Sequence, residues 1–252
     1  MLSMDLKKGT LRQVLLITDG CSNHGEDPIA MAALAKEHGI TVNVIGILEE
    51  RNEEYHRKGL KEVEEIAMAG GGVSQIVYTS QLSQTVQMVT RKGMAQTIQG
   101  VINSELSQIL GKDAVIEDLA PQQRGEVMEV ADDLGETMDL EVLILVDASG
   151  SMEKKLATVQ ESLIDLSISL NARMGFNQFS LYAFPGKREE CEQLIDWTPR
   201  LNTLSSIFSK LSSGGITPTG PALKVALAEF TDRLSKRRMI SGDEEYIEGS
   251  GF

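Results

Sequence analysis

The sequence predicts an α/β fold with a doubly wound, mostly parallel sheet and one antiparallel edge strand. Short apolar segments typical of strands alternate with helical segments over residues 9–92, and the alternation returns over residues 140–238. The strand segments are continuous apolar runs, which indicates parallel strands buried on both faces. Hydrophobic residues make up 41% of the 252-residue chain and aromatic residues only 4%, so we expect a mainly aliphatic core.

The first alternating region is expected to supply three strands and three helices. Apolar or β-branched runs predict the strands, and apolar residues at spacings of three and four predict the helices. Asp27 and Pro28 suit the first turn of the first helix, and Gly39 suits its end. The predicted strands are 11–20, 40–48 and 73–79, and the predicted helices are 26–39, 59–72 and 80–92.

The second alternating region repeats this pattern with a longer first helix. A strand over 141–151 is expected to lead into a helix over 154–175, which carries an apolar stripe on one face. Residues 239–252 are acidic and contain glycine, which predicts a disordered tail. The other predicted elements are a strand at 177–186, an antiparallel edge strand at 191–199, a helix at 203–213, and a loop and helix over 214–238.

An acidic connector separates the two regions. Residues 93–113 have an amphipathic helical pattern, and a further helix is predicted over 122–134. Between residues 112 and 139 the chain carries nine acidic and two basic residues. Such a charge run is typical of a solvated connector, although a docking surface for a partner would have the same composition.

Composition limits the classes of partner and compartment. The net charge of −13 argues against nucleic acid as the main partner, because phosphate binding needs a basic face. The two cysteines, Cys21 and Cys191, form no metal-binding spacing, so a reducing compartment is the default. With no secretory signal and no apolar run long enough to span a bilayer, we expect a cytoplasmic protein without a membrane partner.

Oxygen-bearing side chains follow the predicted strands and form the candidate site. Asp147, Ser149 and Ser151 follow one strand, Asp19 follows another within Thr-Asp-Gly, and a glycine-rich loop over 214–220 precedes the last helix. Ligands of α/β proteins bind beyond the carboxyl ends of parallel strands, so these segments are expected to meet. Carboxylates and hydroxyls together favour a hard cation, namely Mg²⁺, Mn²⁺ or Ca²⁺. A simple Ser/Gly turn is the alternative for residues 147–151.

The number of carboxylates suggests what the cation would bind. Two carboxylates among neutral hydroxyls only just balance a divalent cation. If one carboxylate acts through a water molecule, the cation lacks direct anionic ligands and favours an outside carboxylate. The expected partner is therefore a protein that presents an Asp or a Glu.

Together, the three segments resemble the metal-ion-dependent adhesion site of the von Willebrand factor type A (vWA) family. The resemblance assigns the metal ligands to Asp147, Ser149, Ser151, Thr217 and Asp19. It implies that the serine and threonine hydroxyls bind the metal directly, and that the two aspartates bind directly or through water. It also implies a Rossmann-like fold, with Thr217 preferred because it is the first threonine after the glycine pair.

The segments occur in a different order from that of the vWA family, where Asp-x-Ser-x-Ser comes first and Thr-Asp-Gly last. Here Thr-Asp-Gly comes first, so residues 9–92 resemble the second half of the domain and residues 140–238 the first half. We interpret this order as a circular permutation that makes one domain, with residues 93–139 joining the family's usual termini. A swapped dimer, in which the halves of two chains complete each other, fits the same sequence.

Three functions fit these observations. The first is a metal-dependent protein-binding module without enzymatic activity. The second is a metal-dependent hydrolase or phosphatase that uses Asp147 or Ser149, but the Gly-x-Ser-x-Gly elbow is absent and no pattern supports His24, His38 or His56 as a base. The third refines the first: intracellular bacterial vWA proteins often act as regulatory or assembly subunits, which implies an ATPase or a kinase-associated complex as partner.

Overall fold

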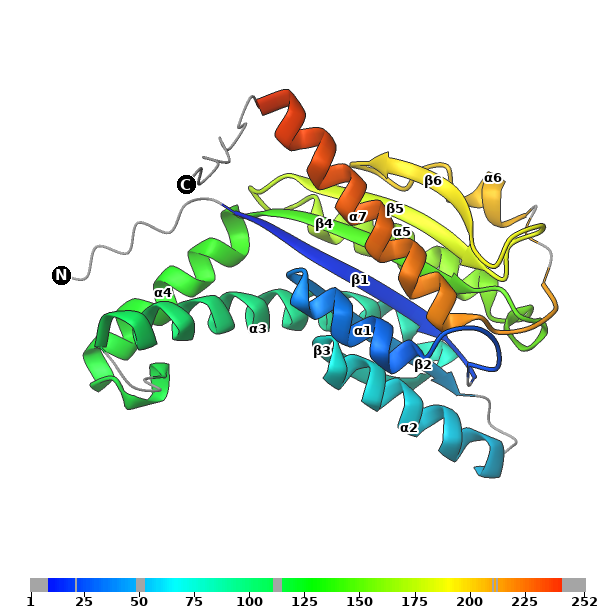
Figure 1. Cartoon of the computed structure of the whole chain (residues 1–252), viewed down its shortest axis with the longest axis horizontal. Coiled ribbons are helices and arrows are strands. Elements are labelled where there is room, and N and C mark those ends of the chain that lie inside the picture. Colours follow the sequence, from blue (N-terminus) through cyan, green and yellow to red (C-terminus); the bar gives the residue numbers. More distant parts are fainter. Residues whose placement is uncertain are drawn as a thin grey trace, which may run out of the picture.

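The computed structural model describes residues 9–20, 22–48, 53–110, 115–209, 211 and 213–241. One six-stranded sheet forms the centre of the molecule, with helices on both faces (Figure 1). Its spatial order is β3-β2-β1-β4-β5-β6, and every neighbouring pair is parallel except β5 and β6. The strands are β1 (Thr10–Thr18), β2 (Ile40–Leu48), β3 (Gly71–Tyr78), β4 (Asp139–Asp147), β5 (Asn177–Phe184) and β6 (Glu192–Thr198). The predicted α/β class and the antiparallel edge strand are thereby confirmed.

The helices fall near their predicted places but differ in length. They are α1 (Pro28–Glu37), α2 (Glu53–Ala69), α3 (Leu82–Leu110), α4 (Pro121–Thr137), α5 (Leu156–Leu170), α6 (Leu204–Phe208) and α7 (Thr219–Ser241). The Asp27 side chain caps α1 by accepting a 3.0 Å hydrogen bond from the Ile29 amide, as predicted. Among the described residues, no helix is both long and apolar enough to cross a membrane.

Several of the predicted boundaries need correction. The predicted helices 80–92 and 93–113 are one continuous helix of 29 residues, α3, which runs through Gly93 because buried apolar residues such as Met94 and Ile98 continue its core-facing side. The predicted helix 203–213 shortens to the five residues of α6. Residues 239–241 continue α7, so this part of the predicted tail is helical, whereas residues 242–252 lie outside the described residues.

Each face of the sheet has its own hydrophobic core. The first core packs the sheet against α3, α5 and α6, and the second packs it against α1, α2 and α7. Successive residues of β4 supply both cores: Val142 and Ile144 face the first, and Leu143 and Leu145 the second. Covering both faces explains why the strands read as continuous apolar runs.

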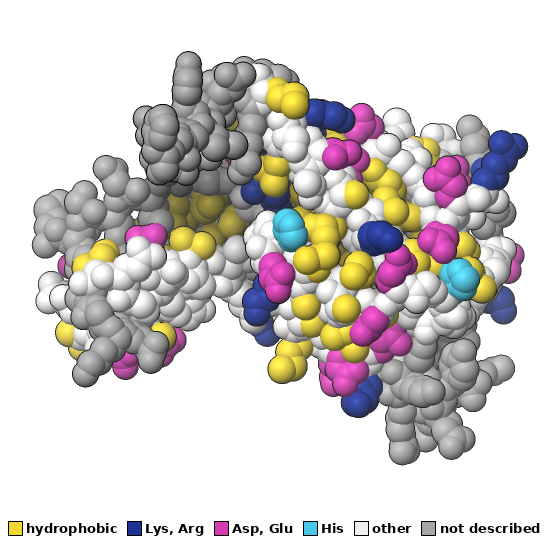
Figure 2. All heavy atoms as spheres, viewed as in Figure 1, with side chains coloured by type: hydrophobic (Ala, Val, Ile, Leu, Met, Phe, Trp, Pro, Cys, Tyr) yellow, Lys and Arg dark blue, Asp and Glu magenta, His cyan; other side chains and the backbone are white. Residues whose placement is uncertain are grey.

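The connector forms an arm at one end of the sheet. α4 lies against the second half of α3, and both extend beyond the strands (Figure 1). The end of α4 is fixed by Arg173, whose guanidinium donates hydrogen bonds to the carbonyls of Gly135 (2.8 Å) and Met138 (2.9 Å). The surface is hollowed beside this arm (Figure 2). A mainly apolar cavity of about 320 Å³ lies between the arm and the start of β1, lined by residues that include Leu11, Ile98, Val101, Leu134 and Met138.

A buried glutamate holds α7 across the sheet near the start of β4. The Glu141 side chain is 3% exposed and faces the guanidinium groups of Arg12, Arg233 and Arg237 at 3.4, 2.7 and 2.5 Å. Arg233 also stacks over Trp197 of β6, with its guanidinium carbon 4.5 Å from the ring centroid. A buried carboxylate needs such cations, because burial without a partner costs several kcal/mol.

The first turn of α7 contacts the loop that follows β1, and glycines make this approach possible. A Cβ atom at Gly220 would lie 1.8 Å from the Glu26 carbonyl oxygen, and one at Gly25 would lie 2.2 Å from the Pro221 side chain. Only a residue without Cβ fits at either position. The beginning of α7 is thereby held against the segment that follows Asp19.

We predict that Gly220→Ala destabilises the protein by about 2 kcal/mol or more, because the added methyl group overlaps backbone that cannot move without shifting α7. Urea denaturation measures the change. Gly100→Ala is the matched control, since it is also a helical glycine but has no atom within 4 Å of the added Cβ. Equal stabilities of the two variants would contradict the close contact at Gly220.

Candidate metal centre

The loop that follows β4 supplies the first part of the site. Asp147 ends β4 and is fully buried, and its Oδ1 accepts a 2.8 Å hydrogen bond from the Ser149 amide. A short 3₁₀ turn over Gly150–Met152 then places the Ser151 hydroxyl oxygen 3.2 Å from that of Ser149. The alternating polar residues of this loop therefore turn toward one point, as the sequence predicts.

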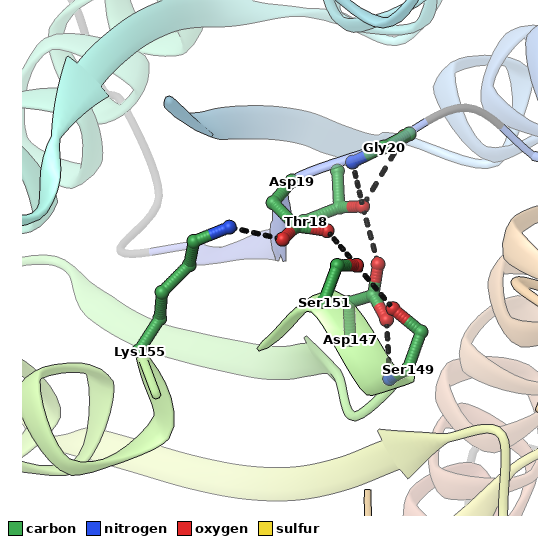
Figure 3. Close-up of polar contacts among 7 residues, drawn as sticks. All are labelled: Thr18, Asp19, Gly20, Asp147, Ser149, Ser151 and Lys155. Atoms are coloured by element: carbon green, nitrogen blue, oxygen red, sulfur yellow. Dashed lines mark hydrogen bonds and ion pairs between the residues drawn. The ribbon is translucent and has the colours of Figure 1, made fainter. Parts of the chain in front are cut away.

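The end of β1 supplies the second part. The Thr18 hydroxyl donates a 2.7 Å hydrogen bond to Asp147 Oδ2, across 129 positions of sequence. The next residue, Asp19, has a side chain that is 2% exposed, and its Oδ1 accepts a 2.8 Å hydrogen bond from the Ser151 hydroxyl. These contacts form because β1 and β4 pair in parallel, with Ile17 opposite Val146, so both strands end at the same edge (Figure 3).

The loop before α7 supplies the third part. Gly214 donates a 3.1 Å hydrogen bond to the Ala148 carbonyl, and this joins the loop to the segment after β4. Thr217 is buried, and its amide donates a 2.8 Å hydrogen bond to Asn23 Oδ1 while its carbonyl accepts one of 3.1 Å from the Asn23 amide. Gly214 and Gly215 have φ angles of 151° and 86°, which glycine adopts without strain.

The structure joins four of the five predicted site residues directly. Hydrogen bonds link Asp147 with Ser149, Ser149 with Ser151, and Ser151 with Asp19. Thr217 lies in the adjoining loop, and its hydroxyl is not part of these bonds. The hydroxyl of Thr219, at the start of α7, is buried without a hydrogen-bond partner among the described residues. We refer to the side chains of Asp19, Asp147, Ser149 and Ser151 as the oxygen cluster.

Lys155 is a site residue that the sequence analysis missed. It is 4% exposed, and its ammonium group forms an ion pair with Asp19 Oδ2 (Figure 3). Lysine is rarely buried without a paired charge, so composition alone places it on the surface. Helical spacing could have indicated it, because Lys155 lies four positions before the buried Val159 of the apolar stripe.

Burial sets the electrostatics of the cluster. Removal of Asp147 from water raises the pKa of its carboxyl group, and the nearby Asp19 carboxylate adds to this effect. Hydrogen bonds from Thr18 and Ser149 act in the opposite direction, because they stabilise the charged form. A buried carboxylate with a raised pKa gains strongly from a nearby cation.

The oxygen cluster has the donor chemistry of a hard-cation site. Two carboxylates and two serine hydroxyls meet at the carboxyl ends of β1 and β4, and the Thr219 hydroxyl, which has no hydrogen-bond partner among the described residues, lies at the adjoining start of α7. Within the described ranges, no group of three or more His, Cys, Asp or Glu side chains is placed to hold a metal. A cation at this point would therefore depend on hydroxyl oxygens as well as on the two aspartates.

A pocket of about 640 Å³ adjoins the Thr217 loop. It is lined by residues 22–29 and by side chains of α2, among them Lys61, Glu62 and Glu65. Burial raises the pKa of the Glu62 carboxyl group, which accepts a 2.8 Å hydrogen bond from the Ser22 amide. Acidic side chains gather on this side of the molecule (Figure 2).

Two of the three histidines have described side chains, and both have contacts of their own. His24 lies 3.3 Å from the Glu190 carboxylate, and His38 Nδ1 lies 2.8 Å from the Leu34 carbonyl oxygen. The side chain of His56 and residue Cys21 lie outside the described residues. The hydrolase alternative, with Ser149 or Asp147 as nucleophile, stays a prediction.

Comparison with known proteins finds similar chains, among them the following two. A protein of Bacillus subtilis (strain 168), described as uncharacterized protein YabS, is 61% identical over 247 residues, which are 98% of this chain and 100% of that protein. The crystal structure of an uncharacterized protein from Alicyclobacillus acidocaldarius has a TM-score of 0.82 at 40% sequence identity, covering 90% of this chain and 96% of the other. This similarity supports the six-stranded α/β fold. No protein-family model matches the chain.

We predict that Thr18→Val lowers the free energy of unfolding by about 2 kcal/mol when Asp147 is ionised, because the buried carboxylate loses a hydrogen-bond donor. Urea denaturation in the absence of divalent cations measures this loss. Thr90→Val is the control: in the part of the chain that the structure describes, its buried hydroxyl bonds only the Val86 carbonyl of its own helix, so no charge is left unpaired. A loss at Thr18 no larger than that at Thr90 would contradict the contact with Asp147.

Proposed function

The chain belongs to the family of YabS from Bacillus subtilis, and we propose that it binds a protein partner through a divalent cation held by the oxygen cluster. One observation carries this proposal. Side chains from two distant segments, Asp19 on one side and Asp147, Ser149 and Ser151 on the other, meet in one hydrogen-bonded group at the carboxyl ends of paired strands.

The proposal includes the assignment of the fold to a circularly permuted vWA domain. It is supported by the position of the Asp-x-Ser-x-Ser strand, β4, directly beside the Thr-Asp-Gly strand, β1, in the middle of the sheet. The Gly-Gly-x-Thr loop lies next to both, which is the arrangement that the vWA resemblance implies. In this assignment residues 140–238 and 9–92 are the first and second halves of the domain, and residues 93–139 form the connector.

Asp19, Asp147, Ser149, Ser151 and Thr217 would hold the cation, which we propose to be Mg²⁺, with Mn²⁺ or Ca²⁺ as substitutes. The bound cation would supply a Lewis-acidic position for a carboxylate oxygen. Thr18 and the Ser149 amide orient Asp147, and the Ser151 hydroxyl orients Asp19. Thr18, Asp147, Ser149 and the Asp19 side chain are buried, so little water competes with the contacts among them, whereas Ser151 is exposed and leaves the site open to a partner.

The partner would be a protein that presents an Asp or a Glu to the cation. We propose that the chain acts in the cytoplasm as a regulatory or assembly subunit, beside an ATPase or within a kinase-associated complex, and not as an enzyme. The net charge of −13 supports a protein partner over nucleic acid.

Replacement of Asp147 tests the metal site. Asp147→Asn removes one of two carboxylates, so we expect the affinity for Mg²⁺ or Mn²⁺ to fall by more than about tenfold in isothermal titration calorimetry. Asp232→Asn, at an exposed position of α7, is expected to bind like the wild type. Unchanged binding in the Asp147 variant, or no binding by the wild-type protein, would overturn the proposal.

Oligomeric state separates a single-chain domain from a swapped dimer. In the described structure both halves of the sheet come from one chain, with β1 of the first region beside β4 of the second. We therefore expect a monomer that binds the cation, measured by size-exclusion chromatography with light scattering followed by calorimetry. A cation-binding dimer with no binding-competent monomer would favour the swapped arrangement.

A further inference from the structure

We propose that Lys155 competes electrostatically with the divalent cation and thereby makes cation binding depend on the partner's carboxylate. The inference rests on the proposed function, because it concerns the same site. It assigns a regulatory role to a residue that the vWA resemblance did not include.

The position of Lys155 is the first argument. Its side chain is 6% exposed and that of Asp19 is 2% exposed, so the ion pair is almost completely shielded from water. Lys155 is the only lysine among the described residues that is buried. Screening by solvent is weaker at such depth than at the surface, so its charge acts more strongly than that of a surface lysine on any cation that approaches Asp19.

The contacts of Asp19 are the second argument. Its Oδ1 accepts the hydrogen bond from Ser151, and its Oδ2 pairs with the Lys155 ammonium. Both oxygens of the carboxylate are therefore engaged before any metal arrives. If the cation binds Asp19 directly, the Lys155 ammonium has to move away. If the ammonium stays beside the cation, two positive charges lie close together in a poorly hydrated site. Lys155 disfavours the cation in both cases.

The charge balance gives the third argument. Asp19 and Asp147 as carboxylates together with Lys155 carry a net charge of −1, so a divalent cation brings the site to +1. One carboxylate from outside then restores neutrality. Without Lys155 the same cation would balance the two aspartates alone, and an added carboxylate would bring excess negative charge. Lys155 therefore weakens cation binding on its own and strengthens the attraction for an acidic partner.

The test compares Lys155→Met with wild type, using Mg²⁺ and Mn²⁺ titrations of the full chain by calorimetry. Methionine has similar length but no charge, so we expect the affinity for the cation to rise about tenfold or more. Lys154→Met, the adjacent exposed lysine, and Lys155→Arg, which keeps the charge, are expected to bind like the wild type. Far-UV circular dichroism checks that each variant is folded.

A second measurement uses acetate as the carboxylate probe. Replacing chloride by acetate should raise the cation affinity of the wild type more than that of Lys155→Met. If the single variant does not fold, Asp19→Asn is compared with Asp19→Asn/Lys155→Met, in which no buried carboxylate at position 19 is left unpaired. The double variant should then bind the cation more tightly.

The outcomes separate this inference from the proposed function. If the wild type binds the cation and removal of the Lys155 charge does not increase its affinity, the inference is wrong and the metal site stands. If neither the wild type nor Lys155→Met binds a divalent cation, both fail. Tighter binding by Lys155→Met together with a smaller acetate effect supports the inference.

Discussion

The parallel pairing of β1 with β4 is the constraint on which the rest of the molecule depends. It places two strands from separate regions of the chain at the centre of one sheet, with β2 and β3 on one side and β5 and β6 on the other. Parallel strands end at the same edge, so the pairing also brings the residues after Thr18 and Asp147 together across 129 positions of sequence. If one of these strands shifted by one residue in this pairing, each of its side chains would turn to the opposite face of the sheet.

β4 carries a buried carboxylate near each of its ends, and the two are stabilised in different ways. Glu141 faces three arginines from β1 and α7, so its negative charge is more than balanced. Asp147 accepts hydrogen bonds from Thr18 and Ser149. The ion pair with Lys155 is formed by the other carboxylate of the site, that of Asp19. The first arrangement fixes α7 on the sheet, whereas the second leaves a net negative charge that can still attract a cation.

The sequence predicted the strands more closely than the helices, for a physical reason. A strand covered on both faces needs an unbroken apolar run, which is visible without knowing its neighbours; the predicted strand 40–48 coincides with β2. Helix ends depend on tertiary contacts. α3 continues past residue 92 because the apolar residues Met94, Ile98 and Ile102 continue its buried side, and a boundary placed by composition missed this.

The sequence predicted those site residues that directly follow an apolar strand. Asp147, Ser149, Ser151 and Asp19 each follow an apolar strand, and the fold brings them together as expected. The position of the Thr217 backbone and the burial of Lys155 depend on contacts with distant segments, such as Asn23 and Asp19. Helical spacing hints that Lys155 is buried, but the partners of both residues lie far away in the sequence, so the contacts themselves emerged only from the structure.

The central place of β1 also affects how the protein is made. β1 leaves the ribosome before the other five strands of the sheet, yet one of its edges pairs with β4, which begins at Asp139, and it shares a core with α7, which begins at Thr219. During synthesis, one edge of β1 therefore stays unpaired until β4 has been made. Such open edges pair readily with other molecules. The acidic connector is synthesised in this interval, and its charge would keep the unfinished chain soluble until the sheet can close.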